Sequence, residues 1–298
     1  MKVALTGATG YIGSHVLTEL HEHGHEVTAL VRGDTQADIV AARGAKPAVV
    51  DLYDRPAMVS LLADGDGAIH TASPSDATTA DMDSAVADAV IEAFAGTGKT
   101  YIEISGMWVY GANTSITEES PFHAPALVAW KEPIERRVLG ATGMRAVVIV
   151  SSTAYGDGGG AIPGALLASP RDDAGNLIMI GTGQQHWSTV HAADLADAFR
   201  RVLEDDSARG RYVIGNGVNP TVAELTEAAA VAAGAAGAVP GSEEEARARL
   251  GDYFAEVLLL DQGTDAARAR AEFGWRPTHM GFVDELRNGS YRKQATNA

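Results

Sequence analysis

The sequence predicts an α/β fold, a doubly wound parallel sheet with a smaller C-terminal lobe. Short apolar runs alternate with helical patterns through the first half of the chain, which is typical of βαβ units and a parallel sheet. Several of these runs are apolar on both alternating sets of positions, as expected of strands that helices cover on both faces. After about residue 155 the pattern changes to shorter, mixed elements.

The first half contains apolar runs such as KVALT, EVTALV and MRAVVIV, separated by helical patterns. Right-handed crossovers would wind these elements into one sheet. The strands are expected at 2–6, 26–31, 47–51, 67–71, 100–105 and 144–150, and the helices at 11–23, 35–43, 54–63, 80–95 and 121–140.

The second half begins after a flexible glycine-rich loop, GDGGG at 156–160. It shows no internal repeat, and its elements are expected to fold onto the carboxyl edge of the sheet, where open α/β sheets bind ligands. The strands are expected at 177–181, 186–190 and 211–215, and the helices at 192–204, 221–233, 243–250, 264–272 and 281–289.

The composition excludes several classes of function. The chain has 298 residues, of which 46% are hydrophobic and 21% charged, ordinary values for a soluble globular protein. Its formal net charge of −16 argues against nucleic acid or an anionic membrane surface as a partner. The absence of cysteine excludes disulfides, thiolate metal ligands and a cysteine nucleophile, and no metal site is predicted.

The pattern of hydrophobicity predicts no membrane span and no signal peptide. No run of about 18 apolar residues occurs, and the first residues, MKVALTG, already resemble a core strand. A targeting segment would instead place a charged stretch before a short apolar one. We therefore expect a cytoplasmic protein with no membrane partner.

A glycine-rich turn follows the first expected strand and opens a helix. In TGATGYIGSHV at 6–16, Gly7, Gly10 and Gly13 are spaced three residues apart. Glycine at these positions permits a tight turn, close approach of the backbone to a pyrophosphate, and tight packing of helix on strand. The amides and dipole of the helix then face the anion. The turn predicts a dinucleotide-binding site.

The end of the second expected strand predicts which dinucleotide is bound. Arg32 follows this strand in the motif LVRGD. A carboxylate here takes the ribose 2′-hydroxyl of NAD, whereas an arginine suits the 2′-phosphate of NADP, and its planar group also stacks on adenine. Asp34 lies close by, so NADP is the expected cofactor and NAD is the alternative.

Motifs in a fixed order carry a resemblance to a known family. They are TGATGYIG at 6–13, DLYD at 51–54, IHTAS at 69–73, ISGMWVYG at 104–111, STVHAADLADAF at 188–199 and ARAEFGWRP at 269–277. With them the sequence resembles the extended or atypical short-chain dehydrogenase/reductases, also described as the NAD-dependent epimerase/dehydratase family. We expect a Rossmann core at 1–155, and at 156–298 mainly a substrate-binding lobe with some segments returning to the core.

The resemblance implies which residues bind the cofactor. Asp51 inherits the carboxylate that takes the adenine amino group, and Lys131 inherits the lysine that holds the nicotinamide ribose hydroxyls. The expected cofactor-binding residues are Gly7, Thr9, Gly10, Tyr11, Ile12, Gly13, Arg32, Asp51, Leu52, Thr71, Ala72, Ser73, Lys131, Ser151 and Thr153.

Two of the three catalytic positions that the resemblance implies depart from the family pattern. The family uses a tyrosine whose pKa is lowered by a lysine, together with a serine or threonine that positions the substrate oxygen. Leu127 occupies the tyrosine position and cannot transfer a proton. Gly106 occupies the serine position; Ser105 is adjacent but on the opposite face of the strand. Only Lys131 matches.

The residues left to carry protons are Lys131, Ser105, Tyr155 and His123. A lysine desolvated beside a nicotinamide would have a lowered pKa and act as acid or base; the alternative is a lysine that only binds the ribose. Pro133 predicts that the helix begins or kinks near it, with Lys131 at the helix mouth. His123 lies in the loop entering that segment, and for Tyr155 a packing role is the alternative.

The expected substrate pocket is lined by Met107, Trp108, His123, Tyr155 and Trp187. Trp187 stands where nucleotide-sugar enzymes of the family often carry a phosphate-binding arginine, which argues against a nucleotide sugar. Aromatic walls with a few polar groups suit a small, largely apolar molecule.

These features together predict an NADP-dependent oxidoreductase acting on a small, largely apolar metabolite, with hydride chemistry supplied by the cofactor. Two alternatives stay open: an epimerase or dehydratase whose bound cofactor is transiently reduced, and a non-catalytic NAD(P)-binding sensor or scaffold. The resemblance also implies a homodimer formed through the helices around 80–95 and 121–140.

Overall fold

The computed structural model describes residues 1–295, which divide into two compact units. The first unit comprises Met1–Ser105, Trp130–Val150 and Leu195–Tyr212. The second comprises Gly106–Ala129, Ser151–Asp194 and the chain from Val213 onwards. Each unit is therefore assembled from segments that are distant in the sequence.

The first unit is built on one seven-stranded parallel sheet of order β10-β6-β5-β4-β1-β2-β3. Because the chain runs outward from β1 to β3 and then returns to place β4 on the other side of β1, the winding reverses between β1 and β4. That reversal is the point where open α/β sheets bind ligands. The strands are β1 Lys2–Thr6, β2 Glu26–Val31, β3 Lys46–Val49, β4 Gly67–His70, β5 Thr100–Gly106, β6 Arg145–Ser151 and β10 Gly210–Ile214.

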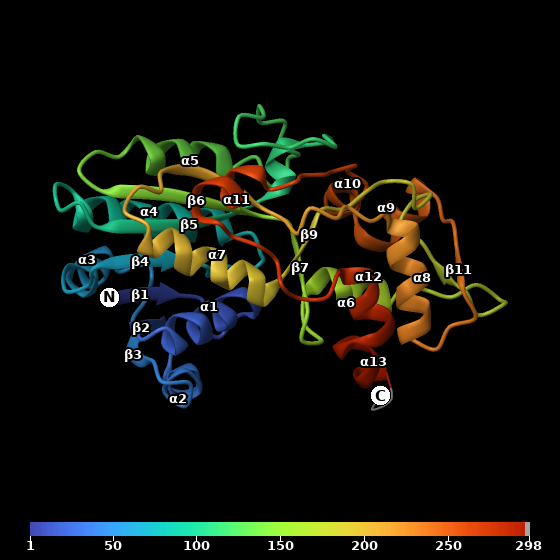
Figure 1. The fold of residues 1–298 in the computed structure, drawn as a ribbon, viewed down its shortest axis with the longest axis horizontal. Coiled ribbons are helices and arrows are strands. Elements are labelled where there is room, and N and C mark those ends of the chain that lie inside the picture. Colours follow the sequence, from blue (N-terminus) through green and yellow to red (C-terminus); the bar gives the residue numbers. More distant parts are fainter. Residues whose placement is uncertain (296–298) are drawn as a thin grey trace. The chain divides into compact units, whose positions relative to one another are not determined.

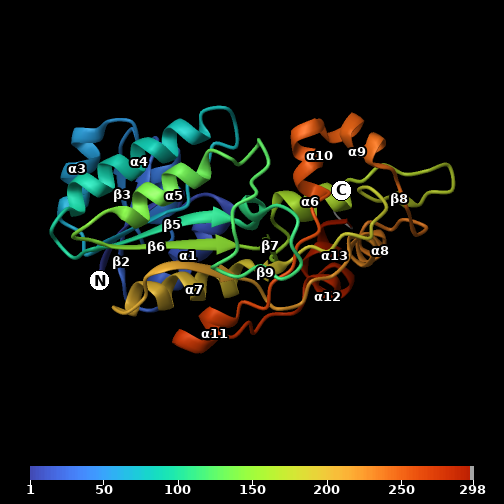
Figure 2. The same ribbon diagram turned by 90° about the horizontal axis from the view of Figure 1, so that it is seen from above.

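Helices cover both faces of this sheet. In Figures 1 and 2, α1 and α7 lie on one face, and α3, α4 and α5 lie on the other. Apolar side chains of the second group, including Met58, Val90 and Ile134, pack in one cluster with the buried Tyr101 of β5. The helices are α1 Tyr11–Glu22, α2 Asp34–Ala41, α3 Arg55–Ala63, α4 Thr79–Phe94, α5 Lys131–Gly140 and α7 Ala192–Glu204.

The predicted doubly wound fold is confirmed, and one helix of the first half differs from its prediction. The helix expected at 121–140 begins only at Lys131, and turns without helix precede it. Pro121 and Pro125 explain the difference, because a proline disfavours helical backbone at the residue before it and lacks an N–H to donate. Pro133 lies in the first turn of α5, where proline is tolerated, so Lys131 does lie at the start of this helix, as predicted.

The second unit contains short strand pairs and a group of small helices. β7 (Thr153–Tyr155) pairs with β9 (Thr189–His191), and β8 (Leu177–Ile178) pairs with β11 (Ala238–Val239). A 3₁₀ turn, η1, covers Met107–Tyr110. The helices are α6 Ala161–Leu167, α8 Val222–Ala232, α9 Glu243–Leu250, α10 Asp252–Leu258, α11 Ala267–Phe273, α12 Phe282–Asn288 and α13 Ser290–Ala295.

The predictions for the second half are less accurate than those for the first. The expected helices at 192–204 and 243–250 occur at those residues, whereas the strands expected at 177–181 and 186–190 shorten to β8 and β9. β7, β11, α6, α10 and α13 were not predicted. They span two to seven residues each, too few for a hydrophobic period to be recognised. Among the described residues, no helix is long and apolar enough to cross a bilayer.

A buried histidine makes the stability of the second unit sensitive to pH. The ring of His191 stacks on His279, with centroids 4.2 Å apart, and meets Tyr155 edge-on at 5.5 Å. Its Nδ1 accepts the backbone N–H of Ala193 at 3.2 Å. Burial, and then the proximity of His279, lower the pKa of His191. A depressed pKa means that the folded state binds this proton less readily than the unfolded chain does.

We therefore expect acid to destabilise the protein through His191. The stabilisation is complete above the unfolded pKa near 6.5 and is lost as pH falls through the lower folded value. Lowering the pH from about 7.5 to about 5.5 should reduce the unfolding free energy through this residue. Urea denaturation at both pH values should show a smaller loss in His191→Asn than in wild type or in the exposed-site control His23→Asn. Equal losses in all three would contradict the assignment.

Candidate active site

The glycine turn between β1 and α1 is tightly packed at two of its three glycines. A Cβ on Gly7, whose φ is +75°, would lie 2.5 Å from the backbone nitrogen of Ala72. A Cβ on Gly13 would lie 2.1 Å from the carbonyl oxygen of Gly7. Gly10 is looser, with its nearest contact at 3.2 Å, and it is exposed together with Thr9. The turn is therefore closely packed at Gly7 and Gly13 and exposed at Thr9 and Gly10.

The start of α1 fits the phosphates of a dinucleotide. Its N-terminal cap is Gly10, no side chain caps it, and no acidic residue lies in the first turn. The first N–H groups of a helix lack partners within the helix, and the dipole adds partial positive charge there. A helix start that its own side chains leave uncapped and unneutralised is suited to bind an anion.

Gly13→Ala tests this packing. The added methyl would overlap the Gly7 carbonyl, so we expect the unfolding free energy to fall by about 1–3 kcal/mol and dinucleotide binding to be lost. Gly140→Ala is the matched control, because nothing lies within 4 Å of the Cβ it would add in α5. Denaturation and titration with NADPH measure both effects. Normal nucleotide binding by Gly13→Ala would remove the turn from the cofactor site.

The other residues expected to bind the adenosine end lie along the same sheet edge. Arg32 directly follows β2 and is exposed, and the exposed Asp51 comes two residues after β3. Asp51 Oδ1 accepts the N–H of Tyr53 at 3.0 Å, which fixes its carboxylate, and Leu52 is half-buried. Since β1, β2 and β3 are adjacent and parallel, their carboxyl ends bring the glycine turn, Arg32 and Asp51 to one edge.

The segment Thr71–Ser73 follows β4 and is held against the end of β1. The Thr71 hydroxyl donates to the Thr6 carbonyl at 2.8 Å. The N–H groups of Thr71 and Ala72 donate to Thr6 Oγ1 at 3.3 and 3.4 Å. Ser73 beyond them is exposed. This part of the expected cofactor site is thus placed beside the glycine turn.

Lys131 lies in a buried cluster of charged residues that the sequence did not predict. Its ammonium donates to Asp83 Oδ2, to Glu103 Oε1 at 3.2 Å and to the carbonyl of Ile104 at 2.9 Å. The Lys131 side chain is 12% exposed, and those of Asp83 and Glu103 are 2% and 0% exposed. Tyr101 donates its hydroxyl to Glu103 Oε2.

This cluster determines the charge of the lysine. Burial alone would lower the pKa of Lys131, but the carboxylates of Glu103 and Asp83 outweigh burial and raise it above its ordinary value. The hypothesis of a lysine whose pKa is lowered by desolvation is therefore wrong. Lys131 is a cation at any physiological pH.

Ser105 is buried and already engaged. Its hydroxyl donates to Glu135 Oε1 at 2.6 Å, and Glu135 Oε2 accepts from Arg211 at 2.8 Å. The hydroxyl hydrogen of Ser105 is therefore donated to another residue of the first unit. Leu127, in the tyrosine position, is 37% exposed.

The expected residues of the second unit fall into buried and accessible groups. Tyr155 is fully buried, donates its hydroxyl to the carbonyl of Met280 at 2.8 Å and stacks on Phe282; burial raises its pKa well above the ordinary value. Trp187 is also buried, and its indole N–H donates to the Leu258 carbonyl at 3.0 Å. His123, by contrast, is exposed.

Met107 and Trp108, the remaining residues of the expected pocket, lie in η1. Trp108 is half-buried and meets Phe254 of α10 edge-on at 6.2 Å. Met107 is buried, and its sulfur accepts the Ser152 hydroxyl at 2.9 Å. Phe254 was not predicted as a pocket residue, and nothing in its sequence neighbourhood marks it. Ser151 is buried and donates to the Ser152 carbonyl at 2.7 Å, and Thr153 is half-buried in β7.

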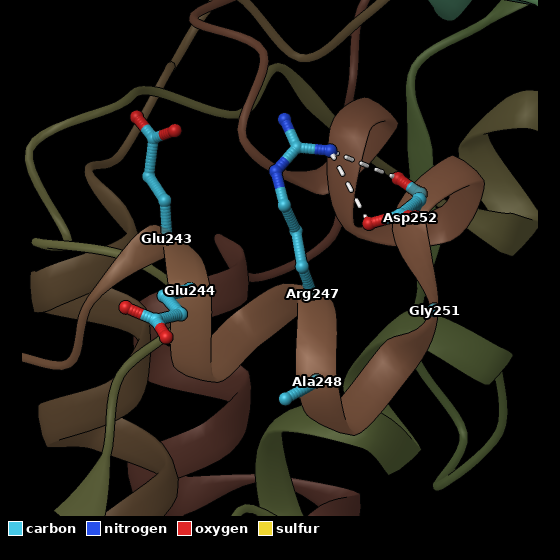
Figure 3. Close-up of a pocket in the computed structure, with 6 residues that line it drawn as sticks. All are labelled: Glu243, Glu244, Arg247, Ala248, Gly251 and Asp252. Atoms are coloured by element: carbon cyan, nitrogen blue, oxygen red, sulfur yellow. Dashed lines mark hydrogen bonds and ion pairs between the residues drawn. The ribbon is translucent and has the colours of Figure 1, made fainter.

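A separate hollow of about 650 Å³ lies beside α9 and α10 (Figure 3). Glu243, Glu244, Arg247, Ala248, Gly251 and Asp252 line it, and none of them belongs to the expected site. Arg247 lies 3.9 Å from the Asp252 carboxylate.

The family follows from comparison with known proteins. The chain belongs to the NAD dependent epimerase/dehydratase family, because the model of that family matches residues 3–215. An uncharacterised protein of Schizosaccharomyces pombe is 29% identical over 304 residues, spanning 98% of this chain and 100% of that protein. A 3-diazoavenalumate denitrifying reductase of a Streptomyces species is 25% identical over 320 residues, spanning 96% and 99%.

Solved structures share the fold over nearly the whole chain. MoeE5 in complex with UDP-glucose and NAD has a TM-score of 0.78 at 21% identity and covers 100% of both chains. The human epimerase family protein SDR39U1 with NADPH has a TM-score of 0.77 at 22% identity, covering 97% of this chain and 99% of that one. One of these structures of the same fold thus holds NAD and the other NADPH.

Proposed function

We propose that the protein is an NADP-dependent oxidoreductase acting on a small, largely apolar metabolite. The observation that supports NADP is the exposed Arg32 at the end of β2, the strand that pairs with β1, which leads into the uncapped start of α1. Arginine's fixed fork of donors matches the oxygens of a 2′-phosphate. NAD is the alternative, since relatives of the fold are found with either cofactor.

The residues of the first unit would hold this cofactor along the carboxyl edge of the sheet. Thr9–Gly13 would bind the pyrophosphate, Arg32 the 2′-phosphate, Asp51 and Leu52 the adenine, and Thr71–Ser73 the central part. When bound, the cofactor supplies the hydride chemistry. Lys131 would add a fixed positive charge beside the nicotinamide ribose.

The second unit contains the residues of the predicted substrate pocket. The Trp108–Phe254 pair is an aromatic surface suited to an apolar molecule. Trp187 is buried and donates its indole N–H to the Leu258 carbonyl. It therefore provides no positive charge that could bind a diphosphate. This arrangement favours a metabolite without a nucleotide over a nucleotide sugar.

Proton transfer is the role that remains to be assigned. The hydroxyl hydrogens of Tyr155 and Ser105 are donated to Met280 and Glu135. Lys131 is held as a cation by two carboxylates. Of the four predicted catalytic residues, His123 is the one that is exposed, and a neutral imidazole has both a donor and an acceptor nitrogen. We therefore assign substrate contact and proton donation to His123.

The test measures the consumption of NADPH, through its absorbance, in the presence of a panel of small carbonyls, imines and enones. The proposal predicts net oxidation of NADPH with at least one apolar compound and little with UDP-sugars. His123→Asn should lower kcat while leaving NADPH binding unchanged. Tightly held cofactor with no net consumption would point instead to an epimerase or dehydratase, and binding without any turnover to a sensor or scaffold.

A further inference from the structure

The ammonium of Lys131 has no hydrogen left for a ligand. An ammonium carries three hydrogens and no acceptor, and Lys131 has three protein acceptors: Asp83 Oδ2, Glu103 Oε1 and the Ile104 carbonyl. Its Nζ also lies 4.9 Å from the ring centroid of Trp130. A ribose hydroxyl can therefore accept a hydrogen bond from Lys131 only after one of these contacts opens.

Asp83 is itself fixed from the other side by a chain of hydrogen bonds. Thr6 Oγ1 accepts the N–H groups of Thr71 and Ala72, so its own hydrogen is directed to His70 Nδ1, 2.6 Å away. His70 then carries its hydrogen on Nε2 and donates it to Asp83 Oδ1 at 3.1 Å. The chain connects the segment after β4 with the carboxylate that holds Lys131.

Two carboxylates contact the one ammonium of this cluster. Asp83 and Glu103 both lie within ion-pair distance of Lys131 Nζ, and both carboxylates are almost fully buried. Burial raises the pKa of Asp83, but the hydrogen bond from His70 and the charge of Lys131 outweigh it and lower that pKa. Both carboxylates therefore attract the ammonium strongly in a region of low polarity.

We propose that Asp83 and Glu103 are positioning residues that hold the Lys131 ammonium turned into the protein, so that a bound cofactor engages it only by displacing a carboxylate. This inference rests on the proposed function in its second half alone. The inward orientation of the Lys131 ammonium, here called the withdrawn lysine, is a property of the first unit. It can be tested without any cofactor. The displacement of a carboxylate by the cofactor, here called the exchange, is tested separately, by whether the affinity for NADPH rises or falls in the variants.

The first experiment measures acylation of individual lysines by mass spectrometry at mildly alkaline pH. Lys131 should react far more slowly than the exposed Lys46 in wild type. In Asp83→Asn its rate should rise about tenfold, the change in unprotonated amine that one pKa unit brings. Glu103→Gln should act in the same direction. Asp81→Asn removes an exposed charge from the same helix and should leave the acylation rate of Lys131 unchanged. A thermal melting curve for each variant checks that it is properly folded.

The second experiment measures NADPH binding by titration. Asp83→Asn should bind NADPH about threefold to tenfold more tightly than wild type, because a lysine that is already released removes the conformational cost from the apparent affinity. The gain should vanish in Asp83→Asn combined with Lys131→Met. A merely structural Asp83 would instead weaken binding when replaced.

These outcomes separate the two ideas. Unchanged acylation of Lys131 in both Asp83→Asn and Glu103→Gln would overturn the withdrawn lysine, whatever the protein binds. Faster acylation with weaker NADPH binding, or a gain that persists without Lys131, would overturn the exchange. If wild type binds neither NADPH nor NADH while acylation behaves as expected, the proposed function fails and the exchange fails with it, but the withdrawn lysine stands.

Discussion

Lys131→Met is expected to lower the unfolding free energy by about 3–5 kcal/mol, the range for removing one partner from a buried ion pair. Methionine fills a similar volume, so the loss would arise from charge: Asp83 and Glu103, almost fully buried, would be left without their cation. Urea denaturation measures the effect. Because an enzyme so destabilised can lose activity for structural reasons, this result also decides how a loss of turnover in Lys131→Met is to be interpreted.

A second substitution distinguishes charge from packing. Adding Glu103→Gln to Lys131→Met removes one of the two unpaired carboxylates, and the glutamine amide can still bond to the Tyr101 hydroxyl. We expect at least half of the lost stability to return. Lys46→Met, at an exposed position in β3, is the control. A Lys131→Met variant within about 1 kcal/mol of wild type would contradict the buried ion pair.

Arg32→Ala is expected to weaken NADPH binding by about 10-fold to 100-fold, which corresponds to roughly 1.5–3 kcal/mol for hydrogen bonds to a charged group. NADH lacks the 2′-phosphate, so its affinity should change by less than about threefold, through loss of stacking on the adenine alone. Arg32 is exposed and lies outside the core, so the fold should be unaffected. Calorimetric titration of both nucleotides measures the ratio.

Two control variants accompany Arg32→Ala. Asp34→Asn alters the neighbouring charge at the start of α2 and should slightly favour NADPH, since a negative charge beside the 2′-phosphate is removed. Arg43→Ala, another exposed arginine of the first unit, should change neither affinity. Equal losses of NADPH and NADH in Arg32→Ala would exclude the 2′-phosphate as its ligand.

The fold was predictable from local patterns because each βα unit of the first half repeats the same signals. The run KVALT, the glycine turn and the amphipathic stretch after it predicted β1 and α1 to within a residue. The start of α5 was harder to predict. Pro133 indicates a start or kink near it, whereas the apolar spacing before it predicts a helix that Pro121 and Pro125 disfavour.

The candidate site was only partly predictable, because its charged cluster depends on contacts between distant residues. Lys131 meets Asp83 across 48 positions and Glu103 across 28, and no local motif encodes such pairs. A signal existed, however. Glu103 interrupts the apolar strand TYIEIS, and Asp83 lies among the buried residues of α4. A carboxylate in a position that the pattern gives to the core requires a buried partner.

The predictions for Tyr155 and Trp187 also depend on burial. Tyr155 and Trp187 were singled out for their chemistry, but each is buried with its polar hydrogen bonded to a backbone carbonyl. Large aromatic residues commonly combine a buried ring with one satisfied polar group. Burial, which sequence position alone does not give, separates them from the exposed His123.

Net hydride transfer from NADPH to a substrate is the central claim, and one measurement tests it most directly. NADPH deuterated at the transferred position of the nicotinamide would be incubated with the enzyme and the compound that the panel identifies, and the product would be analysed by mass spectrometry. The predicted result is one deuterium in the released product for each NADPH oxidised. Product without deuterium, or deuterium that stays with a cofactor that is never oxidised, would contradict it.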